Sequence, residues 1–146
     1  MPLLHMVVKQ TGPTKPFEWT IPYTKLDKWY PLVEVRFLTD SGDWIPIPLI
    51  FDSGAEATLL RPRYAKQFPD GEQELVGVVG SGQRSPADIL KDIQVEFLAR
   101  KLKCDVIVRE LPCHSFVGGL FGRNCFKPFG FAVWESAREL YVTLKP

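Results

Sequence analysis

The sequence predicts an all-β protein, and three observations support that prediction. Stretches of alternating character recur, as in 31–38, where Glu34 and Arg36 alternate with valine and phenylalanine. Residues that favour turns, mainly glycine, proline, aspartate and serine, separate these stretches. The chain shows no coiled-coil pattern and no internal repeat, so little helix is expected.

The expected elements follow one another in chain order. Pro13, Pro16 and Pro22 predict an irregular N-terminal arm over 1–28. A single domain is expected over 29–146, because a chain of 146 residues suits one core. Pro46 and Pro48 occupy alternate positions, which predicts an edge strand there. Strands are expected over 31–38, 44–51, 88–98, 103–109, 131–134 and 139–144, with a turn at 99–102, a short helix or irregular turn at 61–68, and a closing hairpin formed by the last two strands.

Composition excludes several classes of protein. The chain is 45% apolar and 24% charged, with a formal net charge of +1, which is ordinary for a globular domain and argues against nucleic acid as the main partner. A membrane span is not expected. The first ten residues lack a small-residue cleavage site, so no secretory signal is predicted and a cytoplasmic protein is expected.

Three cysteines, Cys104, Cys113 and Cys125, cannot all pair within one chain, so free thiols are expected, although a disulfide stays open. Cys113 and His114 with Cys104 suggest zinc only weakly. No Cys-x-x-Cys or matching histidine spacing accompanies them, and neighbouring residues of a strand would point to opposite faces. No metal and no other cofactor are predicted.

The tripeptide Asp-Ser-Gly occurs twice, and its two contexts differ. Asp40 lies between two strand-like stretches, which is typical of a hairpin turn. Asp52 follows the apolar run Leu49-Ile50-Phe51, so its carboxylate is expected in a buried place where catalysis becomes plausible. An extended 44–51 strand would hold the two turns about 26 Å apart. A carboxylate pair would therefore need a second copy of Asp52 from a twin subunit.

Two glycine-containing segments complete the pattern. Residues 74–82 mix glycine with valine and predict a mobile β-hairpin whose backbone can approach a ligand closely. They lack the Lys-Ser/Thr and the helix of a phosphate-binding loop. Residues 116–126 predict an apolar strand that runs into Gly122-Arg123-Asn124 and a helical turn ended by Pro128.

The order of these segments resembles the retropepsin family of homodimeric aspartic proteases, over roughly Trp29 to the C-terminus. Phe51 to Ala55 resembles the catalytic turn, Val76 to Gly82 resembles the flap, and Leu120 to Asn124 resembles the motif that opens the C-terminal helix. The resemblance implies a closed-barrel-like acid protease fold with one short C-terminal helix. Ser53 stands in place of the commoner threonine, and a Val-Val pair replaces Gly-Ile in the flap.

The resemblance also implies a site and a mechanism. Peptide bonds would be hydrolysed by a water held between Asp52 of two subunits, in extended substrates with apolar residues beside the cut. The expected partners are a second copy and a peptide or protein substrate. Glu56 and Arg123 would form a buried or half-buried ion pair. The other expected site residues are the turn Ser53, Gly54 and Ala55, the flap Val76, Gly77, Val78, Val79 and Gly80, and the pocket residues Leu59, Val117 and Leu120, each of which could equally be core. A catalytically silent dimer that binds a partner peptide is the alternative.

Overall fold

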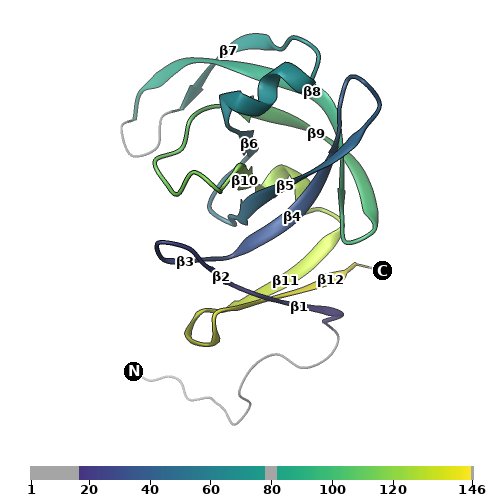
Figure 1. The fold of residues 1–146 in the computed structure, drawn as a ribbon, viewed down its shortest axis with the longest axis vertical. Helices are drawn as coiled ribbons and strands as arrows, with labels where there is room; N and C mark the ends of the chain where they lie inside the picture. The colour runs from purple at the N-terminus through teal and green to yellow at the C-terminus, as the bar shows by residue number, and fades with distance from the viewer. Residues whose placement is uncertain (1–16, 78–81, 146) are drawn as a thin grey trace.

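The structure is a computed structural model that describes residues 17–77 and 82–145, and it confirms the all-β prediction (Figure 1). Its short helical elements are the 3-10 turns η1 (Pro62–Gln67), η2 (Arg123–Cys125) and η3 (Glu135–Ala137). The strands are β1 (Trp19–Pro22), β2 (Thr24–Lys25), β3 (Trp29–Tyr30), β4 (Leu32–Leu38), β5 (Trp44–Phe51), β6 (Thr58–Leu60), β7 (Glu72–Gly77), β8 (Arg84–Phe97), β9 (Arg100–Val108), β10 (Gly119–Phe121), β11 (Phe129–Trp134) and β12 (Glu139–Leu144).

Two main sheets organise the described residues. The larger has seven strands in the order β4-β5-β10-β6-β9-β8-β7, and β8 pairs in addition with β4. The smaller has the order β1-β12-β11 and lies below the larger sheet in Figure 1. A two-stranded ribbon, β2-β3, lies between the first strand and the main sheet in sequence. The expected hairpin of 131–134 with 139–144 is confirmed as β11 and β12.

Aromatic side chains join the two sheets in one core. Phe51, the last residue of β5, stacks on Phe126 with ring centroids 4.4 Å apart. Phe97 packs against Phe121 of β10 and against Phe129 of β11. Offset and edge-on packing of this kind adds to the stabilisation from burial alone. The residue that precedes Asp52 is therefore anchored at the junction of the sheets.

The prediction of an irregular arm over 1–28 is wrong for its second half. β1 pairs with β12, with Trp19 opposite Val142 and Ile21 opposite Leu140. Alternating half-buried residues of β1 lie along one edge of β12, and Pro22 is tolerated because β1 is itself an edge strand of this sheet. Residues 1–16 lie outside the described part of the chain.

Three smaller expectations are also corrected. β5 is an edge only in its first part, because Leu49–Phe51 pairs with β10, beyond both prolines. The turn expected at 99–102 is a two-residue turn at Leu98 and Ala99, both with positive φ, and β9 begins at Arg100. The expected C-terminal helix is only the single turn η2, whereas the short helix or turn expected at 61–68 is confirmed as η1.

Candidate active site

The Asp52 turn begins where β5 leaves the core. The backbone N–H of Asp52 donates to the carbonyl of Phe121 at 3.0 Å. Within the turn, the Gly54 N–H donates to Asp52 Oδ1 at 2.9 Å, and the Ala55 N–H donates to the Asp52 carbonyl at 3.2 Å. Asp52 is half-exposed in the single chain, so the expectation of a buried carboxylate is wrong here. Phe51 is the last residue that faces the core, and the turn lies at the surface.

The second Asp-Ser-Gly copy is an ordinary hairpin turn, as predicted. Thr39 and Asp43 close it with a backbone hydrogen bond of 2.8 Å, and Gly42 adopts φ +90°. A positive φ of this kind favours glycine. The turn joins β4 to β5 at the end of β5 opposite Asp52, so Asp40 and Asp52 do not belong to one site.

The segment after β10 holds the far side of the Asp52 turn. The Arg123 N–H donates to the Ala55 carbonyl at 2.8 Å, and the Asn124 N–H donates to the Glu56 carbonyl at 3.2 Å. Gly122 lies so close that a Cβ atom there would be 2.2 Å from the carbonyl oxygen of Ala57. Only glycine permits this approach of the two backbones. The segment Gly122-Arg123-Asn124 therefore has a structural role, because it holds the Asp52 turn in place.

Thr58 and Asn124 form a part-buried link that the sequence pattern does not assign to the site. Thr58 is fully buried, and its N–H and its hydroxyl both donate to Asn124 Oδ1 at 2.9 Å. The Gly122 N–H donates to Thr58 Oγ1, and Asn124 Nδ2 donates to the carbonyl of Asp105. The available signal was a threonine placed at the start of the apolar run Thr58-Leu59-Leu60. A buried hydroxyl requires partners of this kind.

A half-buried apolar strip runs across the sheet beside the Asp52 turn. In the pairing registers Ile50 is opposite Leu120, Leu120 is opposite Leu59, and Leu59 is opposite Ile107. All four are half-buried, whereas their chain neighbours Leu49, Phe51, Leu60 and Phe121 are buried on the core side. The register thus brings the predicted pocket residues Leu59 and Leu120 together and adds Ile50 and Ile107, which were not predicted.

The third predicted pocket residue does not join the strip. Val117 is fully buried and clusters with Tyr30 and Leu32. In the single chain it is a core residue, which is the alternative that the sequence left open for it. The Val117 N–H donates to the carbonyl of His114 in a turn, so Val117 lies outside the strand that carries Leu120.

The predicted glycine-containing hairpin is present at its base. β7 pairs with β8, with Val76 opposite Ser85 and Gly77 opposite Arg84. Val78, Val79 and Gly80 lie outside the described residues. Arg109, which follows β9, donates through Nη2 to Ser85 Oγ at 2.7 Å and to the carbonyls of Ser85 and Val76. This arginine, which sequence reasoning missed, ties the hairpin to the strand that carries Ile107.

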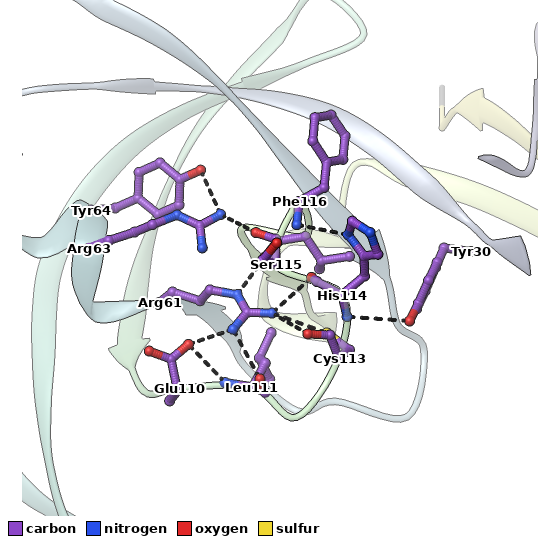
Figure 2. A network of polar contacts seen from close by, with 11 residues as sticks. Tyr30, Arg61, Arg63, Tyr64, Glu110, Leu111, Cys113, His114, Ser115 and Phe116 are labelled. Atoms are coloured by element: carbon purple, nitrogen blue, oxygen red, sulfur yellow. Dashed lines mark hydrogen bonds and ion pairs between the residues drawn. The ribbon is translucent and has the colours of Figure 1, made fainter. Parts of the chain in front are cut away.

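Arg61 is the centre of a polar network between β6 and the loop 110–118 (Figure 2). Its side chain is buried, and its guanidinium donates to the carbonyls of Leu111, Cys113, His114 and Val117 and to the carboxylate of Glu110. The hydrogen bond and charge of Arg61 lower the pKa of Glu110. The sequence predicts only a short helix or turn around Arg61, since no local pattern indicates that one arginine donates to distant carbonyls.

Glu56 and Arg123 form the predicted ion pair, but it is exposed. Their closest N–O distance is 3.7 Å, and their side chains are 89% and 54% exposed. The prediction of a buried or half-buried pair is therefore wrong for the single chain. Backbone hydrogen bonds, rather than these side chains, connect the two segments, because both side chains extend outward from the turns that carry them.

The three cysteines are unpaired thiols, and two of them are buried. Cys125 Sγ lies 3.2 Å from Thr58 Oγ1. A hydrogen bond with Cys125, together with burial, raises the pKa of Cys104. Cys113 and His114 lie in the loop 110–118, so the expectation that they are neighbours within a strand is wrong. Residues 17–77 and 82–145 contain no group of three or more histidine, cysteine, aspartate or glutamate side chains arranged to hold a metal.

Comparison with protein-family models gives no match, and comparison with curated proteins gives none either. In the part of the chain that the structure describes, no helix has the length and apolar character needed to cross a membrane.

Proposed function

We propose that this chain is one subunit of a homodimeric aspartic endopeptidase with a retropepsin-type closed barrel. The observation that carries the proposal is the Asp52 turn, held by Gly122–Asn124 and flanked by the strip Ile50, Leu120, Leu59 and Ile107. The extra pairing of β8 with β4 supports a closed barrel, because it links the two ends of the strand order β4-β5-β10-β6-β9-β8.

The chemistry would use Asp52 from each of two subunits. Two carboxylates about 3 Å apart cannot both be ionised, so they share one proton. The ionised carboxylate takes a proton from a bound water, while the protonated one donates to the carbonyl oxygen of the peptide. The water oxygen bonds to the carbonyl carbon and gives a tetrahedral diol. The carboxyl that took the water's proton then passes it to the peptide nitrogen, and the C–N bond breaks as the nitrogen leaves as the amine. The other carboxylate takes its proton back from the diol as the new carboxyl group forms, so the pair again shares one proton.

The second subunit is supported by the exposed edge of the smaller sheet. β11 is the last strand in the order β1-β12-β11, and its Phe131 and Val133 are 37% and 46% exposed. Phe131 packs on Phe51, with ring centroids 5.1 Å apart, so this edge is continuous with the residue before Asp52. An apolar edge strand is a natural site of pairing with another chain. We infer that two β11 edges meet across a two-fold axis, which would bring the Asp52 turns together.

The substrate would be an extended peptide with apolar residues beside the cut. The strip offers half-buried isoleucine and leucine side chains, which suit apolar partners. The β7–β8 hairpin, fixed at its base by Arg109, would cover the substrate from the opposite side and exclude bulk water. Peptides recognised in this way pair with the enzyme as strands.

The decisive test uses the two Asp-Ser-Gly copies as a matched pair. Purified protein is incubated with a diverse peptide library across a range of pH, together with Asp52→Asn and Asp40→Asn. Asp52→Asn should lower the cleavage rate by on the order of 10²–10⁴ or more, because the amide cannot accept the proton of water. Asp40→Asn should cleave at the parent rate, and the pH profile should be bell-shaped, with both limbs belonging to the pair.

Equal cleavage by Asp52→Asn and the parent would show that Asp52 is only a turn residue. The silent-dimer alternative gives a different result. In that case neither protein cleaves any library peptide, yet both are dimers and bind peptides equally well.

A further inference from the structure

A groove on the face of the molecule formed by β1, β4 and the β8–β9 turn contains an unpaired strand edge. Its volume is about 500 Å³, and its apolar lining includes Ile21, Leu32, Val33, Phe97 and Leu98. It is distinct from the Asp52 site, because none of the residues of the Asp52 turn or of the apolar strip lines it. Figure 1 shows β4 above β1, with the smaller sheet below the larger one.

The unpaired edge exists because β8 ends at Phe97 and does not extend along the first residues of β4. β4 pairs with β5 from Leu32 to Leu38, but on its other side it pairs with β8 only at Arg36 and Phe37. After Phe97 the chain turns at Leu98 and Ala99 and returns as β9. No described strand therefore pairs with Leu32 and Glu34 on the groove side.

The prolines of β5 fix the direction in which the backbone groups of this edge point. Glu34 is opposite Pro48 and Arg36 is opposite Pro46, and proline has no N–H to donate. These are the non-hydrogen-bonded positions of the antiparallel pair. Pro31 instead accepts from the Phe51 N–H, and the Thr39 N–H donates to Asp43, so the odd positions face β5. The N–H and carbonyl groups of Leu32 and Glu34 consequently point into the groove.

The charge of the groove indicates what would bind there. Its charged lining consists of Glu34, Arg36 and Glu96, which sum to one negative charge. Arg36 is already paired with Glu96 at 2.8 Å. In the described part of the chain Glu34 is exposed and has no ion-pair partner. In a strand added beside β4, one side chain would lie opposite Glu34 on the outer face. The side chains before and after it would lie against the apolar lining of the groove.

We propose that this groove is a second peptide-binding site, which takes an extended segment of a partner protein by strand addition to Leu32–Glu34. The segment carries apolar residues on either side of a basic residue that pairs with Glu34. Main-chain hydrogen bonds to Leu32 and Glu34 supply affinity, and the alternating side chains supply specificity. The site does not depend on the proposed peptidase activity.

The test uses the full chain with Asp52→Asn, so that a bound peptide is not cut, and a fluorescent peptide in which valine alternates with lysine. Binding is followed by fluorescence anisotropy, and amide hydrogen exchange is measured residue by residue. We expect the amides of Leu32 and Glu34 to become protected in the complex. A peptide with the same sequence whose lysines are N-methylated on the backbone should not bind, because it cannot donate to the edge.

Charge variants make the test specific. Glu34→Lys should weaken binding of the valine–lysine peptide about three- to tenfold and should favour a valine–glutamate peptide instead. Asp70→Lys, which makes the same charge change outside the groove, should leave both affinities at the parent values.

Three results would overturn the proposal. The first is absence of binding at millimolar peptide. The second is protection of amides beside Asp52 with none at Leu32 and Glu34. The third is a drop in the sedimentation mass of the peptide-free protein on Glu34→Lys, which would assign the edge to a second copy of this chain.

Discussion

Arg61 shows how one residue can organise a loop that carries no regular structure. A buried charge is costly unless hydrogen bonds and a counter-charge surround it. Here the guanidinium meets carbonyls from Leu111 to Val117 and the carboxylate of Glu110, so the charge is satisfied while the loop gains a fixed course. The planar fork of arginine suits this arrangement, and the point charge of lysine does not.

Arg61→Ala should therefore lower the free energy of unfolding by about 3–5 kcal/mol, because several loop carbonyls lose their donor. Arg61→Lys should recover only a small part of this loss. Arg63→Ala is the matched control: it removes an exposed arginine that donates to Ser115, and it should cost less than about 1 kcal/mol. Urea unfolding curves measure all three, and an Arg61→Ala midpoint equal to that of Arg63→Ala would contradict the role given to Arg61.

Tyr23 makes the stability dependent on alkaline pH. Burial and the hydrogen bond to Glu135 raise the pKa of Tyr23 to about 12. The phenol ionises near pH 10 in the unfolded chain, whereas in the folded protein it stays protonated up to a pKa of about 12. The contribution of Tyr23 to the free energy of unfolding is therefore fully present below about pH 10 and is lost as the pH rises from about 10 to about 12. Tyr23→Phe should flatten this decline, and Tyr64→Phe should retain it. Unfolding midpoints measured from pH 8 to 12 test this, and equally steep curves for both variants would disprove it.

At the scale of elements, the Asp52 turn depends on the segment after β10. Backbone bonds from Arg123 and Asn124 and the side-chain link from Asn124 to Thr58 connect the two, while the Glu56–Arg123 ion pair is exposed. An exposed pair contributes about 0–1 kcal/mol. A buried donor that loses its partner costs about 1–3 kcal/mol. Replacing Arg123 and replacing Asn124 should therefore change the free energy of unfolding by different amounts, although the two residues are neighbours in the chain.

Asn124→Ala should lower the free energy of unfolding by about 2–3 kcal/mol, because the buried N–H and hydroxyl of Thr58 lose their acceptor. Arg123→Ala should lower it by less than about 1 kcal/mol. Thermal and urea unfolding of the two proteins under the same conditions provide the comparison. A larger loss for Arg123→Ala would mean that the ion pair, and not the Asn124 link, holds the turn.

At the scale of the whole molecule, a single copy of Asp52 requires assembly for the proposed chemistry. The exposed edge of β11 is the surface that this assembly would use. Val133 is the better residue for a test, because Phe131 also packs on Phe51 and Phe126 and its loss would disturb the core.

Val133→Lys should weaken self-association by on the order of tenfold or more, since a charge on an edge strand opposes pairing. Peptide cleavage should fall in parallel, while the far-ultraviolet circular dichroism stays that of the parent. Leu75→Lys places the same charge on an exposed leucine of β7 and should leave the sedimentation behaviour unchanged. If Val133→Lys sediments like the parent at every concentration, β11 is not the dimer surface.

Local patterns in the sequence predict the all-β class, the two Asp-Ser-Gly turns with their different contexts, and most of the strands. These depend on alternation and turn residues, which act between near neighbours in the chain. The tertiary structure decided what depends on register and long-range contact. It paired β1 with β12, brought Leu59 beside Leu120, moved Val117 into the core and gave Arg61 its distant carbonyls. It also left the Glu56–Arg123 pair exposed, because burial depends on what surrounds a residue in space and not on its neighbours in sequence.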